Sequence, residues 1–80
     1  MIDKIIEIYQ VYYVDNIGVH NKSFSTDLDN QAKQNAINCY NFSSDKCEYI
    51  SLSVTVFIEH DAKIETRIDK ILLEKWNKNE

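Results

Sequence analysis

The clearest pattern along the chain is an alternation of apolar and polar positions over residues 49–59. Every even position from Ile50 to Ile58 is aliphatic, whereas the odd positions are polar apart from Tyr49 and Phe57. This period of two, rich in β-branched residues, predicts a strand with one buried face and one mostly polar face. We therefore expect a sheet that is covered on one side.

Two further strands are expected before this one. Residues 5–14 are β-branched and aromatic on both faces, which is typical of a strand in the middle of a sheet. Residues 15–18 read Asp-Asn-Ile-Gly and favour a tight turn, because Asn and Gly tolerate positive φ. Residues 19–24 are short and polar, as suits an edge strand. The first two strands should form a hairpin.

Two helices complete the prediction. The first helix is expected over residues 26–41, with Ser25 or Thr26 as its capping residue. Asp27 and Asp29 would then lie at the positive end of the helix dipole. Their helical stripe is formed by Leu28, Ala32, Ala36, Cys39 and Tyr40. After Asp61 a second helical stripe is predicted from Ile64, Ile68, Ile71, Leu72 and Trp76.

The element order is therefore strand, strand, helix, strand, helix within a single domain over residues 1–80. We expect an α+β fold, ββαβα, with a three-stranded antiparallel sheet. A right-handed crossover gives the strand order 2-1-3. Both helices should pack on one face of the sheet, because the aliphatic positions of the third strand need a cover. The opposite face is expected to stay open.

Charge narrows the class of partner. The chain has thirteen acids and nine bases, a net charge of −4, and its last twenty residues hold five of each, so the first sixty carry eight acids against four bases. Direct nucleic-acid binding needs a basic stripe and is not expected. A protein partner with a basic surface fits better. No apolar run approaches the roughly 18 residues of a membrane helix, and no secretory leader is expected, which favours the cytoplasm.

Candidate chemistry is sparse. Zinc-binding residue types occur at four positions without finger spacing: His20, Cys39, Cys47 and His60. Cys47 lies between Lys46 and Glu48, a mixed field that does not favour a reactive thiolate. Asp27 and Asp29 are two residues apart and would not face each other on a helix. We expect no catalytic residues, metal or cofactor; a small thiol or metal enzyme is the less favoured alternative.

Aromatic residues suggest where a partner would bind. A contiguous apolar patch on the open sheet face would mark an interface, and tyrosines are favoured there. The alternative is that the rings only cover the sheet, and a base-stacking platform would need flanking Lys or Arg residues. The expected partner-binding residues, aromatic anchors and steering acids together, are Tyr9, Tyr13, Asp27, Asp29, Asp45, Glu48, Tyr49, Phe57 and Glu59.

A short acidic chain with a hairpin over residues 5–24, an Asp-led helix over 26–41 and a strand over 49–59 resembles the small phage-encoded inhibitors of bacterial defence, anti-CRISPR proteins among them. The resemblance implies a non-enzymatic protein that binds and inhibits a protein target, such as a nucleic-acid-binding effector in a host cytoplasm. Bacteriocin immunity proteins and antitoxins look similar at this level. A structural homodimer without inhibitory role is a further alternative.

Overall fold

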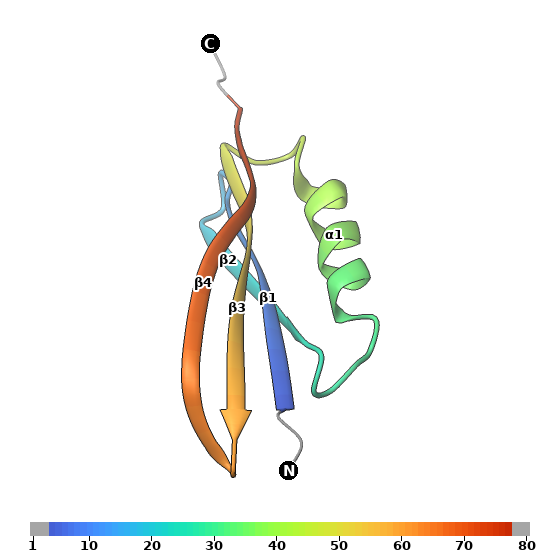
Figure 1. Cartoon of the computed structure of the whole chain (residues 1–80). Helices are drawn as coiled ribbons and strands as arrows, with labels where there is room; N and C mark the ends of the chain where they lie inside the picture. Colours follow the sequence, from blue (N-terminus) through green and yellow to red (C-terminus); the bar gives the residue numbers. More distant parts are fainter. Residues whose placement is uncertain (1–3, 78–80) are drawn as a thin grey trace.

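The computed structural model describes residues 4–77. Its elements are β1 (Lys4–Val14), β2 (Val19–Ser25), α1 (Ala32–Ser43), β3 (Tyr49–His60) and β4 (Lys63–Trp76). The strands form one antiparallel sheet in the order β2-β1-β3-β4. The helix lies on one side of the sheet and the other side is bare (Figure 1). The expected single α+β domain with one open sheet face is therefore present, but its elements differ from the prediction.

The alternation in β3 determines the core, as expected. The even positions of β3 face α1, and in β1 the odd positions pair with them, so that Val11 lies opposite Leu52. Helix α1 contributes Ala32 and Ala36, whose small side chains let its backbone approach the sheet closely. The buried apolar residues are Tyr9, Val11, Ala32, Ala36, Tyr40, Cys47, Ile50, Leu52 and Val54.

The predicted first hairpin and the antiparallel pairing of β3 with β1 are confirmed. The turn between β1 and β2 is held by Asp15, whose carboxylate accepts hydrogen bonds from the backbone N–H groups of Ile17 at 2.9 Å and Gly18 at 3.1 Å. Gly18 has φ of 153°, in the region that favours glycine. The sequence therefore encodes this turn locally.

The first helix begins six residues later than predicted, at Ala32. Thr26 does not cap it: its N–H donates to the carbonyl of Glu7, and its Oγ1 accepts from the N–H of Glu7, both at 3.0 Å. These two bonds extend the pairing with β1 past the end of β2. The N–H and hydroxyl groups of Thr26 are therefore hydrogen-bonded to the sheet and cannot begin a helix. As a result, Asp27 and Asp29 lie in the loop before α1 rather than in its first turn.

The prediction of a second helix is wrong, and with it the three-stranded ββαβα fold with two helices. Residues 63–76 form the fourth strand, paired with β3 from Tyr49–Trp76 to His60–Lys63. Because a central strand has backbone donors and acceptors on both edges, β3 needs this second partner. Shifts in register leave Glu65 and Leu72 without a paired residue. Each bulge adds one residue and shifts the alternation of inward and outward side chains by one position. The apolar residues of β4 are therefore three or four apart in places, as they would be in a helix.

A two-residue turn joins β3 to β4. Asp61 and Ala62 have φ of 52° and 63°, as a type I′ hairpin turn requires. Such turns favour Asn-Gly or Asp-Gly, because alanine pays a steric penalty of about 1 kcal/mol in the left-handed region. The Asp-Ala pair carries none of the usual sequence signal, which explains why the hairpin was not predicted.

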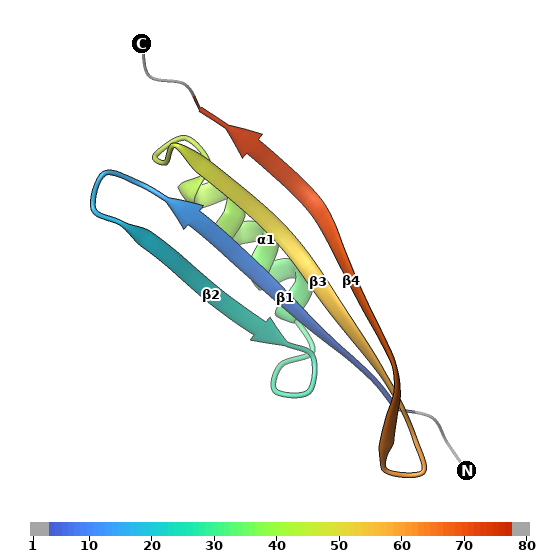
Figure 2. The ribbon, with the colours of Figure 1, turned by 90° about the vertical axis from the view of Figure 1, so that its left-hand side faces the viewer.

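Helix α1 covers only part of the sheet. Its twelve residues span about 18 Å, whereas the twelve residues of β3 span about 40 Å. Within residues 4–77 it packs on β1, β2 and β3 but not on β4. Beyond the helix, residues 4–6, 56–60 and 63–68 form a three-stranded ribbon, here called the distal arm (Figure 2). The molecule is accordingly elongated, 55 × 20 × 18 Å.

Replacing Ala62 by glycine should stabilise the protein. Glycine relieves the steric cost of the positive φ, and we expect the free energy of unfolding in urea to rise by about 0.5–1 kcal/mol. The Ala62→Val variant is the matched control: a β-branched residue is less compatible with this backbone and should lower the stability. If Ala62→Gly is less stable than the parent, the turn is not under the strain described.

Candidate protein-binding site

The open face, defined as the side of the sheet turned away from α1, carries a cluster of three aromatic rings. In one row across three strands, Tyr49 pairs with Val14 on one side and with Trp76 on the other. Tyr12 lies in the next pair along β1 on the same face. The ring centroids of Tyr12 and Tyr49 are 6.0 Å apart with planes at 62°, and those of Tyr49 and Trp76 are 4.3 Å apart at 50°.

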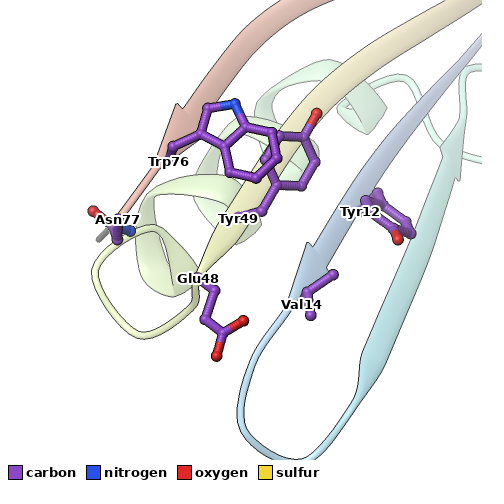
Figure 3. A pocket seen from close by; sticks show the side chains of 6 residues that line it. All are labelled: Tyr12, Val14, Glu48, Tyr49, Trp76 and Asn77. Atoms are coloured by element: carbon purple, nitrogen blue, oxygen red, sulfur yellow. The ribbon is translucent and has the colours of Figure 1, made fainter. Parts of the chain in front are cut away.

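These rings form the walls of a pocket of about 490 Å³. Trp76 is 70% exposed and Tyr12 is 37% exposed, so their ring surfaces are accessible from solvent. Figure 3 shows Trp76 against Tyr49 at one side of the pocket, Tyr12 at the other, and Glu48 at its lower edge. The lining residues are Tyr12, Val14, Glu48, Tyr49, Trp76 and Asn77.

Hydrogen bonds fix one side of the pocket. The hydroxyl of Tyr49 donates to Glu74 at 2.6 Å, a bond that raises the pKa of Tyr49 above its usual value. The side-chain amide of Asn77 donates to the backbone carbonyls of Ser44 and Cys47. These bonds tie the end of β4 to the loop before β3. Because β4 is an edge strand, such anchoring holds Trp76 in place beside Tyr49.

Glu48 contributes a carboxylate that makes no side-chain contact with a partner in residues 4–77. Its backbone N–H donates to Val14 at 2.7 Å and its carbonyl accepts from Asn77 at 2.9 Å, so its main chain is fixed. Its side chain is exposed and, among residues 4–77, makes no hydrogen bond or ion pair. The pocket therefore combines aromatic walls with one carboxylate at its edge.

Two of the expected aromatic anchors lie on the open face. Tyr49 is in the pocket, whereas Phe57 lies in the distal arm, where the guanidinium of Arg67 is 5.6 Å from its ring centroid. Glu59 follows on the same face near the end of the arm. The open face is thus aromatic at both ends, but only the end with Tyr49 forms a pocket.

Tyr9 and Tyr13 lie on the helix side of the sheet, so grouping them with Tyr49 on one face was wrong. Tyr9 is 4% exposed and its hydroxyl donates to Glu7 at 2.9 Å. Tyr13 stacks on His20 with centroids 4.6 Å apart. Because both faces of β1 are apolar, its sequence does not indicate which side chains face the helix. Tyr12, the tyrosine of β1 that lies on the open face, was therefore missed.

The expected steering acids are dispersed. Asp27 pairs with Lys4 at 2.9 Å and Asp45 with Lys75 at 2.8 Å, so both charges are partly neutralised. Asp29 accepts hydrogen bonds from the backbone N–H of Gln31 and from the side chain of Asn35, both at 2.9 Å. Of these candidate acids only Glu48 lines the aromatic pocket. Trp76 was missed because it was assigned to a helix.

The cysteines and histidines do not form a reactive centre in the described residues. Cys47 is buried, and its burial raises the pKa of its thiol, which keeps the sulfur protonated. His20 contacts the carboxylate of Asp15 at 3.1 Å. Within residues 4–77 no three His, Cys, Asp or Glu side chains are placed to hold a metal ion.

Comparisons with protein-family models, with curated proteins and with solved structures found no match. The fold itself defines a small α+β domain, with a four-stranded antiparallel sheet covered on one face by a single helix. In the part of the chain that the structure describes, no helix is long and apolar enough to cross a membrane. The proposed function is therefore based on the geometry of the open face.

Burial of Tyr9 predicts a loss of stability at alkaline pH. Desolvation, together with the hydrogen bond to Glu7, raises the pKa of Tyr9 from 10.0 to about 12. The unfolded chain releases this proton first, so the contribution of Tyr9 is complete below pH 10 and is lost as the pH rises toward 12. The free energy of unfolding in urea should fall across this window, and less so in Tyr9→Phe. Parallel pH profiles for the two proteins would contradict this.

Proposed function

We propose that this protein is a non-enzymatic binding protein that docks its open sheet face on a basic surface of a target protein and thereby blocks it. The observation that carries the proposal is the accessible cluster of Tyr12, Tyr49 and Trp76 on the uncovered face. Tyr and Trp are the residues most enriched among those that dominate binding energy at protein interfaces. A hydrogen bond to Glu74 holds the ring of Tyr49, and Asn77 anchors the chain next to Trp76, which lowers the entropic cost of association.

Charge supports a basic target. The chain carries a net charge of −4, and the carboxylate of Glu48 beside the aromatic rings has no partner within the described residues. Complementary charge accelerates the encounter of two proteins and selects among partners. A basic surface on a nucleic-acid-binding protein is the surface that contacts phosphates. Occupying it would inhibit such an effector, and in this proposal the protein acts in a host cytoplasm as a phage anti-defence inhibitor.

Capture of a partner from the lysate of a host cell tests this proposal. We expect Trp76→Ala to reduce recovery of the captured partner at least about tenfold, since a central aromatic residue contributes about 2 kcal/mol or more. Leu28→Ala is the matched control, because Leu28 is 88% exposed in the loop before α1, away from the open face. Recovery should fall as salt is raised. Equal recovery by Trp76→Ala and the parent would contradict docking through this face.

A structural homodimer is the second candidate, and the exposed apolar residues of the distal arm favour it. On the helix side of the sheet, where α1 does not reach, Ile5 is 61% and Ile68 is 50% exposed. Exposed apolar clusters on small domains are typical of interfaces. The bulges and lysines of β4 discourage edge-to-edge pairing. A second copy would accordingly pack against the face of the arm.

Ile68→Lys tests the homodimer. If two arms pack face to face, a lysine at this position places like charges together and should convert a dimer into a monomer. Sedimentation equilibrium of the parent and the variant measures the change. Lys70→Ile is a converse control that should strengthen association, because Lys70 also lies on the helix side of β4, opposite Val54. A parent protein that is monomeric at about 100 µM would remove this candidate.

A further inference from the structure

We propose that the pocket formed by Tyr12, Tyr49 and Trp76 binds an arginine side chain presented by the target protein. This inference rests on the proposed function and specifies what the open face recognises. It follows from three properties of the pocket: the orientation of its rings, the charge at its edge and its size. The arrangement of the three rings was not accessible from the sequence, because β1, β3 and β4 each contribute one ring.

The rings suit a planar cation. Their planes are inclined to one another by 62° and 50°, so the cluster presents ring faces in more than one direction. The face of an aromatic ring is electron-rich and attracts a cation, with Trp the strongest partner. A guanidinium group is flat, weakly hydrated and able to stack on such a face while its N–H groups point outward. Tyr49 and Trp76, in contact through their rings, form the main wall for this stacking.

The charge at the pocket favours a cation. Among the described residues that line the pocket, Glu48 is the only acidic or basic one. Two nearby cations of the described residues have other partners: Lys75 pairs with Asp45 at 2.8 Å, and Lys46 lies over the ring of Phe42 at 4.0 Å. An adjoining hollow is lined by Asp15, Asp45 and Glu48 together with Lys46, so that even with Lys75 on Asp45 the carboxylates outnumber the ammonium groups among the described residues at this end of the sheet. The local field is thus negative, and a guanidinium can donate to the Glu48 carboxylate.

The size and polarity of the pocket argue against a purely apolar occupant. About 490 Å³ falls within the range of roughly 300–1,000 Å³ that is typical of small-molecule sites, enough for one long side chain. An aliphatic or phenyl side chain would remove water from Glu48 without giving its carboxylate a donor, which is unfavourable. Arginine covers the rings with its guanidinium and satisfies the carboxylate at the same time.

The experiment uses the fluorescence of Trp76, the single tryptophan of the chain. The full protein is titrated with the capped tripeptide Gly-Arg-Gly and with Gly-citrulline-Gly, whose side chain has the same shape but no charge. We expect the arginine peptide to change the Trp76 emission with an affinity about tenfold higher than the citrulline peptide. Equal affinities, or no change with either peptide up to about 10 mM, would overturn the proposal.

Two variants identify the groups responsible. Glu48→Gln should weaken binding of the arginine peptide about fivefold and leave binding of the citrulline peptide unchanged. Glu65→Gln removes an equal charge from an exposed position on β4 outside the pocket and should have no effect. Tyr12→Leu removes one wall, keeps the fluorophore and should also weaken binding. Far-UV circular dichroism confirms that each variant is folded, and equal weakening by Glu65→Gln would overturn the assignment to Glu48.

The outcome separates this inference from the proposed function. If Trp76→Ala abolishes partner capture while the two peptides bind equally, the open face docks on a partner but does not select arginine. If the arginine peptide binds selectively while Trp76→Ala captures its partner as the parent does, the pocket binds arginine and the docking proposal fails. Selective arginine binding together with loss of capture supports both.

Discussion

The structure depends on β3, which must satisfy its backbone hydrogen bonds on both edges while it buries one face. On one edge β1 pairs with it along its length, and on the other edge β4 does so. Its even positions supply Ile50, Leu52 and Val54 to a core that a single short helix closes. Because Ala32 and Ala36 let that helix approach closely, twelve residues are enough to bury the centre of the sheet.

One helix cannot cover four strands, and the candidate binding surfaces are the parts of the sheet that α1 leaves exposed. It leaves the whole open face, β4 and the distal arm in contact with solvent. Two of these exposed regions, the end of the sheet near Glu48 and the distal arm, differ in their side chains. At the end of the sheet near Glu48 the exposed groups are aromatic rings with a carboxylate, which suit a polar or cationic partner. On the helix side of the distal arm they include Ile5 and Ile68, which suit an apolar surface such as a second copy. The proposed binding through the open face and the proposed self-association through the arm would therefore use different residues.

Prediction of the site succeeded where it depended on β3 and failed where it depended on the neighbouring strands. Tyr49 and Glu48 were found, because the alternation of β3 fixes the orientation of Tyr49 and Glu48 lies directly before it. In β1 both faces are apolar, so the choice between Tyr12 and Tyr13 is made by pairing with β3. Trp76 reaches the pocket only because residues 63–76 form a strand. Asp27 and Asp29 were assigned to a helix start, whereas pairing of Thr26 with Glu7 moves that start to Ala32.

The sequence by itself determined the strand over residues 49–59, its buried face, the first hairpin and its Asp15–Gly18 turn, because these features depend on alternation and local turn chemistry. Only the tertiary structure decided the fate of residues 63–76. The spacing of their apolar residues fits a helix, and the Asp61–Ala62 turn lacks the glycine that would indicate a hairpin. What selects the strand is the edge of β3 that β1 leaves free, because its backbone donors and acceptors pair with residues 63–76 along nearly the whole strand. Hydrogen bonding between two backbones does not depend on side-chain periodicity, and it therefore leaves no periodic pattern in the sequence of residues 63–76.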